Sequence, residues 1–217
     1  ILHYGDPALT GRLYEQLRAG MSENYNNLYV LDNHAPEPFP DSWQRLPENR
    51  FWAGALDYCI AEFERAGFTH LWFLNNDILF LSDPPLIERV NQRLAYLEHR
   101  LTKVGIYSPC FTTNPYHPQM VKGEGNGFRL VRYIDGIAPV INLKCCRDVG
   151  GLDCKDNPIG YGVDVWLSFR AYVRGWAVVV DQAIVAKHFY HSTARQVDNF
   201  LEQAAFMATD CLRARLG

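Results

Sequence analysis

Short runs of consecutive apolar residues, set between helical stretches, constrain the fold of this chain more than any other feature. The clearest run is Leu71-Trp72-Phe73-Leu74, which has no polar residue at alternate positions. A strand of this kind is typically covered on both faces, as in a parallel sheet. Helical stretches precede and follow it at 51–66 and 85–102, with apolar residues three and four positions apart. Strands that alternate with helices in this way predict an α/β fold.

The other predicted elements continue this alternation along the chain. Further strands are predicted at 1–4, 28–31, 104–107, 137–143, 176–180 and 184–189, and further helices at 7–19, 164–175 and from about 195 onward. A loop with four prolines covers 33–47, and a longer loop covers 110–134. No repeat and no linker divides the chain, so we expect a single domain over 1–217. Because the sequence opens on Ile1 and not on Met, we allow for a domain excised from a longer chain.

Composition argues against several classes of protein. The chain has 217 residues, of which 48% are hydrophobic, enough for one core and too many for a disordered protein. Its net charge of −3 argues against a nucleic-acid-binding protein, which needs a basic face. No apolar run approaches the roughly 20 residues that a membrane-spanning helix needs. The six cysteines include no C-x-x-C pair, so we expect reduced thiols in a cytoplasmic protein.

Polar residues follow each of the first three predicted strands. They are His3, Tyr4, Gly5 and Asp6 after the first strand, Asp32, Asn33 and His34 after the second, and Asn75, Asn76 and Asp77 after the third. Ligands of open α/β sheets bind beyond the carboxyl ends of the strands. Each group alone is typical of a turn, whereas the three together favour a polar ligand site. Asp77 can hold a divalent cation whose other ligands are phosphate oxygens and water, which fits a nucleoside diphosphate.

A glycine-containing segment, Gly160-Tyr161-Gly162, leads into the predicted helix that carries Asp164. Near a helix start, an aspartate is either a cap that complements the helix dipole or a fixed carboxylate that acts as a general base. Spacing alone favours the cap. A helix start lowers the pKa of an acid, so we expect a base at this position to be weak and to act through alignment.

Two histidines follow the last predicted strand, in the segment KHFYHSTAR at 187–195. A lone histidine is more often structural, but two histidines followed by hydroxyl side chains are harder to dismiss. Either His188 or His191 can complete a metal site or contact a diphosphate.

The order and spacing of these segments resemble glycosyltransferase family 2, whose members use nucleotide sugars and have the GT-A fold. The similar segments are ILHYGD at 1–6, YVLDNH at 29–34, NRFWAGALDY at 49–58, FLNND at 73–77 and AKHFYHS at 186–192. The resemblance implies the donor-binding residues His3, Tyr4, Gly5, Asp32, Asn49, Gly54, Asn75 and Asn76. It also implies a divalent metal cofactor, Mn²⁺ or Mg²⁺, held by Asp77 and His188.

Two later segments resemble the acceptor side of the same family. They are VGGLD at 149–153 and GYGVDVWLSFR at 160–170. Asp164 matches the aspartate that serves as the base in inverting members, whereas Val163 stands where the family has Glu. The resemblance therefore implies Asp164 as the catalytic base and places Asp153, Tyr161 and Trp166 on the acceptor side.

The resemblance implies a three-layer α/β/α fold with a mixed, mostly parallel central sheet. It implies a metal-dependent inverting transfer of a sugar from a nucleoside-diphosphate sugar, such as a UDP-sugar, to a hydroxyl of a glycan, lipid-linked or other acceptor. A lipid-linked acceptor would place the protein peripherally at the cytoplasmic membrane face, in polysaccharide biosynthesis. Three alternatives stay open: a non-catalytic nucleotide-sugar-binding or scaffold domain, a retaining transferase of the same fold, and a nucleotidyltransferase, which usually has a glycine-rich basic loop that this chain lacks.

Overall fold

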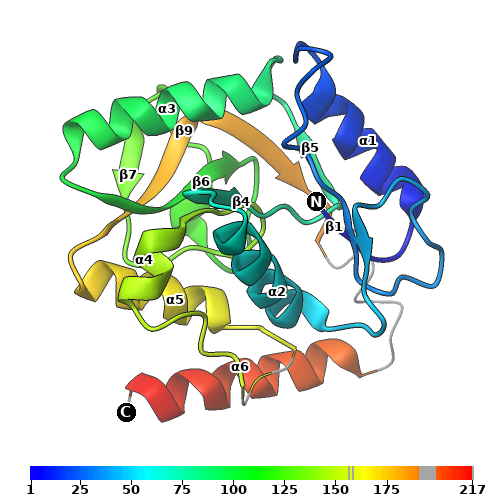
Figure 1. Cartoon of the computed structure of the whole chain (residues 1–217). Helices are drawn as coiled ribbons and strands as arrows, with labels where there is room; N and C mark the ends of the chain where they lie inside the picture. Colours follow the sequence, from blue (N-terminus) through cyan, green and yellow to red (C-terminus); the bar gives the residue numbers. More distant parts are fainter. Residues whose placement is uncertain (156, 158, 191–198, 217) are drawn as a thin grey trace.

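The structure is a computed structural model that describes residues 1–155, 157, 159–190 and 199–216. Helices and strands alternate along most of this part of the chain (Figure 1). The helices are α1 (Pro7–Arg18), α2 (Phe51–Arg65), α3 (Leu86–Arg100), α4 (Leu143–Asp148), α5 (Val163–Val173) and α6 (Phe200–Leu216), with a short 3₁₀ helix η1 (Pro118–Met120). The strands are β1 (Leu2–His3), β2 (Leu31–Asp32), β3 (Gln44–Arg45), β4 (His70–Trp72), β5 (Ile78–Phe80), β6 (Val104–Phe111), β7 (Phe128–Leu130), β8 (Val140–Asn142) and β9 (Ala177–His188).

The main sheet is mostly antiparallel, which corrects the expectation of a mostly parallel sheet. Its order is β4-β8-β6-β9-β5, and β7 pairs with the first half of β9. Within it, β6 and β9 are parallel, while the β4–β8, β6–β8, β5–β9 and β7–β9 pairs are antiparallel. Parallel neighbours need a crossover of a dozen or more residues, usually a helix. No helix separates β4 from β5 in the chain, and these two strands run in opposite directions.

These pairings decide which residues meet at each end of the main sheet. Strands β4, β6 and β9 run in one direction, and β5, β7 and β8 run in the other. Residues that follow β4, β6 and β9 therefore lie at the same end as residues that precede β5 and β8. The segment 73–77 crosses this end, because β4 and β5 stand at opposite edges of the strand order.

A second, three-stranded sheet is parallel throughout, in the order β1-β2-β3. It joins the main sheet where the Leu2 amide donates to the Leu74 carbonyl oxygen at 2.8 Å. This part of the fold contains the first two of the predicted strand ends.

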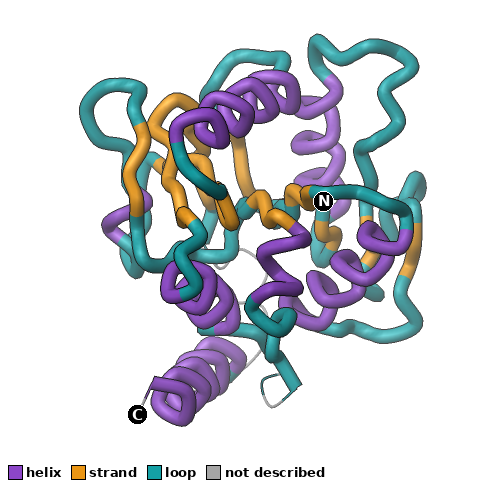
Figure 2. Tube along the Cα trace, turned by 60° about the vertical axis from the view of Figure 1, so that its left-hand side comes forward, coloured by secondary structure: helices purple, strands orange, loops and turns teal. Residues whose placement is uncertain are grey.

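Helices cover both faces of the main sheet. Helices α1 and α3 pack on one face, α4 and α5 pack on the other, and α6 lies outside α5 (Figures 1 and 2). Strand β6 is buried along its whole length, as expected for a strand covered on both faces. The arrangement is a sheet between two helical layers, with α6 as an additional outer helix.

Most predicted helices are confirmed, and the strands differ more. Helix α1 begins at Pro7 because Asp6 caps it, accepting a hydrogen bond from the Ala8 amide at 2.8 Å. The strands predicted at 176–180 and 184–189 are one continuous strand, β9. Strands β3, β5 and β7 and the short helix α4 were not predicted, since two to six residues are too few to show a periodic pattern.

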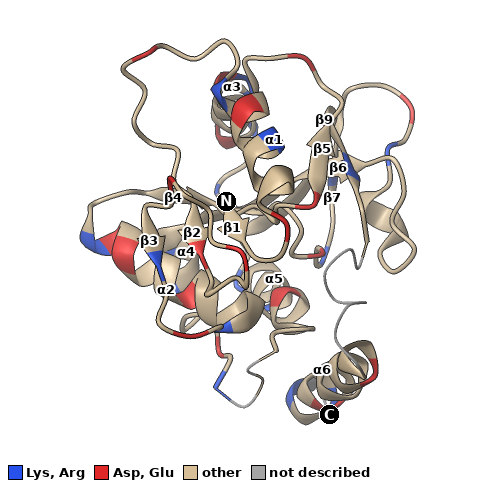
Figure 3. Cartoon of the chain, turned by 90° about the vertical axis from the view of Figure 1, so that its right-hand side faces the viewer, with Lys and Arg blue, Asp and Glu red and all other residues tan. Residues whose placement is uncertain are grey.

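Acidic and basic residues are interspersed over the molecule. Helices α3 and α6 each carry both signs of charge (Figure 3). Among the described residues, no helix is long and apolar enough to cross a membrane. All six cysteines are free thiols, and burial raises the pKa of Cys59 and Cys145 to about 12, which keeps both protonated.

Candidate functional site

Asp77 and His188 form a buried pair at the end of the main sheet. The pairing of β5 with β9 places Ile78 opposite His188, and the Phe189 amide donates to the Asp77 carbonyl oxygen at 2.9 Å. The Nε2 atom of His188 then lies 3.0 Å from Oδ1 of Asp77, and the two side chains are 9% and 13% exposed. The two residues predicted as metal ligands are therefore in direct contact.

Asp135 is a second carboxylate at this end of the sheet. It precedes β8, and its Oδ2 accepts a hydrogen bond from the Nδ2 of Asn114 at 3.0 Å. Burial raises the pKa of Asp135, while the Asn114 hydrogen bond and the nearby His188 oppose the rise. The charge of Asp77 also raises this pKa, so the two carboxylates interact electrostatically.

Asp164 is the third carboxylate and lies in the first turn of α5. Its Oδ2 accepts a hydrogen bond from the Gly136 amide at 2.6 Å, and its Oδ1 accepts one from the Val165 amide at 2.8 Å. Desolvation by the surrounding protein, followed by the charge of Asp135, raises the pKa of Asp164 to about 6. The expectation that a helix start lowers this pKa was wrong, because desolvation and the neighbouring carboxylate outweigh the amide hydrogen bonds.

Gly136 is wedged between Asp164 and an aromatic ring. A Cβ atom at this position would lie 2.4 Å from Cζ2 of Trp52 and 3.1 Å from Cβ of Asp164. Contacts under 3.0 Å essentially never occur for real Cβ atoms. The glycine therefore allows its amide to approach the Asp164 carboxylate under the indole ring of Trp52.

Aromatic side chains surround the three carboxylates, which we call the carboxylate cluster (Asp77, Asp135 and Asp164). Tyr190 packs against the His188 ring with centroids 4.2 Å apart, and Tyr116 packs against Tyr190 at 6.1 Å. The charges of Asp135 and Asp77 help raise the pKa of Tyr190 and Tyr161, after the larger effect of burial. Beside them, a cavity of about 470 Å³ is lined by Thr112, Thr113, Asn114, Pro115, Val121 and Tyr190.

Two predicted donor-binding residues are fully buried and hydrogen-bonded within the protein. The ring nitrogens of His3 contact Thr10 Oγ1 at 2.7 Å and the Glu37 carbonyl oxygen at 2.8 Å. The Asp32 carboxylate accepts hydrogen bonds from the Ala35 and Phe39 amides and forms a 2.7 Å ion pair with Arg45. These contacts hold the loop after β2, and a nucleotide contact of either side chain stays a prediction.

Other predicted donor-binding residues also have structural contacts. Asn49 accepts a hydrogen bond from the Phe51 amide at the start of α2, and Asn76 donates to the Tyr4 carbonyl oxygen at 3.2 Å. Gly5 has a positive φ of 88°, which a glycine adopts without strain. Gly54 lies in the first turn of α2, where a Cβ would lie 3.0 Å from Cβ of Arg50.

Asn75 differs from these residues because its side-chain oxygen is unsatisfied. Its Oδ1 is buried and has no hydrogen-bond partner among the described residues. The Nδ1 of His188 is in the same condition. A buried polar atom without a hydrogen-bond partner is costly, so both atoms can gain free energy by binding a polar ligand.

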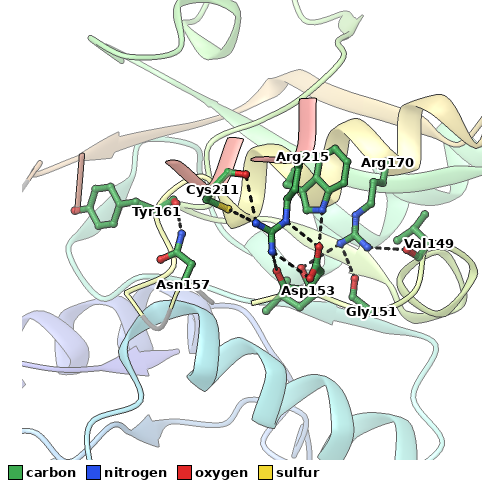
Figure 4. A network of polar contacts seen from close by, with 10 residues as sticks. Val149, Gly151, Asp153, Asn157, Tyr161, Arg170, Cys211 and Arg215 are labelled. Atoms are coloured by element: carbon green, nitrogen blue, oxygen red, sulfur yellow. Dashed lines mark hydrogen bonds and ion pairs between the residues drawn. The ribbon is translucent and has the colours of Figure 1, made fainter. Parts of the chain in front are cut away.

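The predicted acceptor-side residues are held by the end of α6. The Asp153 carboxylate accepts hydrogen bonds from Nε1 of Trp166 and from Nε of Arg215, both at 2.9 Å (Figure 4). These partners, Arg215 above all, lower the pKa of Asp153 to about 2. Figure 4 also shows Asn157, whose Nδ2 donates to the Tyr161 carbonyl oxygen at 2.7 Å. Asp153 and Trp166 thus secure the loop that carries Tyr161, and Tyr161 itself lies nearer the carboxylate cluster.

The metal prediction rests on two residues. Within the described ranges, no three His, Cys, Asp or Glu side chains are grouped so as to hold a metal ion. Asp77 and His188 are in contact, whereas His191 lies outside the described residues. Mg²⁺ commonly takes one or two carboxylates from the protein and its other ligands from phosphate and water. Asp77 fits this pattern as a single carboxylate, and His188 adds an imidazole nitrogen in contact with it.

Sequence reasoning missed Asp135, Gly136 and Asn114. It considered residues that follow strands, as a parallel sheet requires. Because β8 is antiparallel to β6, the residues that precede β8 lie at the same end as those that follow β6. The dipeptide Asp135-Gly136 before an apolar run was the available signal.

Comparisons with known proteins support the fold more than the function. No family model matches the chain. The sequence is 27% identical over 158 residues to uncharacterized proteins of Mycobacterium bovis and Mycobacterium tuberculosis, which covers 68% of this chain and 57% of theirs. Among solved structures, it is similar to GalNAc-T7 with UDP, GalNAc and Mn²⁺, with a TM-score of 0.51 and 10% identity over 75% of this chain and 37% of that one. GalNAc-T7 is a GT-A glycosyltransferase, so this chain has a GT-A-like mixed α/β fold.

Proposed function

We propose that this chain is a metal-dependent, inverting glycosyltransferase that moves a sugar from a nucleoside-diphosphate sugar to an acceptor hydroxyl. One observation carries the proposal: Asp164, with a pKa raised to about 6, stands beside Asp135 and the Asp77–His188 pair in a GT-A-like fold. Such a cluster combines a carboxylate suited to accept a proton with a pair suited to hold a metal–diphosphate group. Perturbed carboxylates of this kind concentrate at functional sites.

Asp164 is the general base of the proposed reaction. With a pKa of about 6, it is mostly ionised at neutral pH and is a stronger proton acceptor than an ordinary aspartate. The Gly136 and Val165 amides bind its two oxygens, so the carboxylate is held in one orientation before the acceptor arrives. It takes the hydroxyl proton as the acceptor oxygen attacks the anomeric carbon from the face opposite the leaving diphosphate, which inverts the configuration at that carbon.

Asp77 and His188 hold the metal ion in this proposal. A metal ion held there would supply positive charge that stabilises the departing nucleoside diphosphate, so no second carboxyl group would be needed as an acid. The segment 73–77 crosses the end of the main sheet and carries both Asn75 and Asp77. The cavity lined by Asn114 and Tyr190 offers room for the acceptor, and Asn114 connects it to Asp135 through a hydrogen bond.

A thermal-shift screen tests donor and metal binding directly. Nucleoside diphosphates and their sugar derivatives are tested with and without Mn²⁺ or Mg²⁺. A ligand at about 100 times its dissociation constant stabilises a protein by roughly 2.7 kcal/mol. We expect a shift that grows with metal and that Asp77→Ala abolishes. The absence of any shift would overturn the proposal in favour of a different ligand class.

Product analysis tests the chemistry separately from binding. A donor identified by the screen is incubated with candidate acceptors, and the anomeric configuration of the product is read by NMR. An inverted product supports Asp164 as the base, and a retained configuration contradicts it. Donor binding without transfer or hydrolysis across acceptors would favour the non-catalytic alternative.

A further inference from the structure

A second cavity lies at the other end of the main sheet from the carboxylate cluster. It measures about 530 Å³ and is formed by the turn before β6 (101–103), the end of β7 with the two residues after it (130–132), and the start of β9 with the two residues before it (175–178), together with Tyr172. These segments lie at the left of Figure 1, around β7 and the beginning of β9. Strand β6 separates the two ends, and its eight residues span roughly 25 Å. We call this space the Lys103 cavity.

The charges that line the Lys103 cavity are all positive. Lys103 and Arg132 line it, and none of the described lining residues is an aspartate or glutamate. The Nζ of Lys103 donates to the Arg174 carbonyl oxygen at 3.2 Å and lies 4.6 Å from the centroid of the Trp176 ring. These contacts fix the ammonium group at the wall of the cavity and leave it donors for a ligand. An anionic group is the complementary ligand chemistry.

The rim of the same cavity is unusually apolar for a surface. Leu130 is 60% exposed and Tyr172 is 45% exposed, and the adjacent Val173 is 65% exposed. Leu101 and Val131 add partly buried apolar walls. Large apolar side chains that stand together at a cavity commonly mark a binding surface. The Lys103 cavity thus pairs two cations with an apolar rim.

We propose that the Lys103 cavity binds an amphiphilic anion, with its phosphate or carboxylate group at Lys103 and Arg132 and its apolar part over Leu130 and Tyr172. The free anion and the headgroup of a membrane lipid share this chemistry. The site does not depend on the proposed sugar transfer, because none of its residues belongs to the carboxylate cluster. It gives the protein a second ligand, bound at a distance from the first.

Calorimetric titration with decyl phosphate, kept below its micelle concentration, tests the proposal on the full chain. We expect saturable binding by one molecule, whereas inorganic phosphate and decanol bind at least tenfold more weakly, because each lacks half of the recognised chemistry. Lys103→Gln and Arg132→Gln should each weaken decyl phosphate binding about tenfold, and Leu130→Ser severalfold. Lys144→Gln, an exposed change on α4, is the matched control and should bind as the unchanged protein does.

Vesicles distinguish the two sources of the anion. Sedimentation is measured with phosphatidylcholine vesicles, with and without phosphatidylglycerol. If the protein binds the anionic vesicles and Lys103→Gln weakens that binding, the natural ligand is a lipid headgroup. If the protein binds decyl phosphate but not the vesicles, the natural ligand is a free anion. The proposal is overturned if neither probe binds, if decanol binds as well as decyl phosphate, or if the double variant Lys103→Gln/Arg132→Gln retains full binding. Melting temperatures verify that each variant is folded.

Discussion

The two ends of the main sheet carry opposite chemistry on the same strands. Where β6 and β9 end, the carboxylate cluster lies among aromatic side chains, and the surrounding protein raises the pKa of Asp164 to about 6. Where the same strands begin, Lys103 and Arg132 stand at an open, apolar rim. The difference shows that desolvation shifts the pKa of a carboxylate at one end, whereas the charges at the other end stand at an open rim where water screens them.

Asp164→Asn gives the largest expected effect, since it removes the proton acceptor and keeps the shape of the side chain. Transfer should fall by about 10²–10⁴-fold, the usual contribution of a general base, while donor affinity is retained. Steady-state kinetics and calorimetry measure the two quantities. Asp148→Asn, an exposed aspartate at the end of α4, is the control and should leave both unchanged. Wild-type turnover in Asp164→Asn would contradict the assignment of Asp164 as the general base.

Gly136→Ala tests whether the geometry around Asp164 is as tight as the distances indicate. The added methyl group would lie 2.4 Å from the Trp52 ring, so Trp52 or the Asp164 carboxylate must move. We expect transfer to fall by at least tenfold and the free energy of unfolding to fall by about 1–3 kcal/mol, as in other overpacked sites. The control is Gly127→Ala, because a Cβ there meets nothing within 4 Å. Equal effects of the two changes would contradict the tight packing of Gly136 between Asp164 and Trp52.

The pH dependence of stability tests the raised pKa at the carboxylate end of the sheet. The pKa of Asp164 is higher in the folded protein than its ordinary value of 3.8, so the folded state holds this proton to higher pH. Protonation of Asp164 therefore stabilises the folded state relative to the unfolded state. This stabilisation is fully present below about pH 4 and is lost as the pH rises through about 6. Asp164→Asn should therefore raise the free energy of unfolding at pH 7.5 by about 1–2 kcal/mol and leave it unchanged near pH 4. Denaturant titrations at the two pH values measure the free energy of unfolding. A gain in stability that appeared only at pH 4 would contradict a raised pKa of Asp164.

The smallest expected effect comes from the contact between α6 and the acceptor-side loop. Asp153 has a pKa of about 2, so its ion pair with Arg215 stabilises the fold above about pH 4 and is lost as the pH falls toward 2. Because the Asp153 side chain is 42% exposed, Arg215→Gln should cost only about 0.5–1 kcal/mol at pH 7. The KM for the acceptor should rise severalfold with little change in kcat, since the loop carries Tyr161. A fall in kcat at constant KM would contradict a role of this loop in acceptor binding.

The sequence predicted the helices better than the sheet, for a physical reason. Apolar spacing identified α1, α2 and α3 nearly to their ends, because each buries one face against the core. An apolar run such as Leu71–Leu74 predicts burial but carries no information on strand direction. The absence of a helix between β4 and β5 was the feature that could have indicated a reversal of strand direction.

The same limit decided how much of the candidate site was predictable. Asp77, Asp164 and His188 follow a strand or begin a helix, and their positions pointed to one end of the sheet. Asp135 precedes an antiparallel strand and acts on Asp164 through space, and its local signal, Asp135-Gly136 before an apolar run, does not show which residues it meets. The pKa of Asp164 likewise depends on tertiary desolvation, whereas the helix start alone predicts a shift in the opposite direction.

The pairing of β6 with β9 has a consequence for how this protein reaches its fold. All eight residues of β6 are buried, and Val104 at its start pairs with Ala177, more than 70 residues later in the chain. Until β9 arrives, β6 presents an apolar strand with an unpaired edge, and contacts of such long range form slowly. Pro109 is the only residue of β6 that cannot donate a backbone hydrogen bond to a stray strand. Refolding should therefore lose protein to aggregation in proportion to concentration, and variants that loosen β9 should aggregate before they lose their helices.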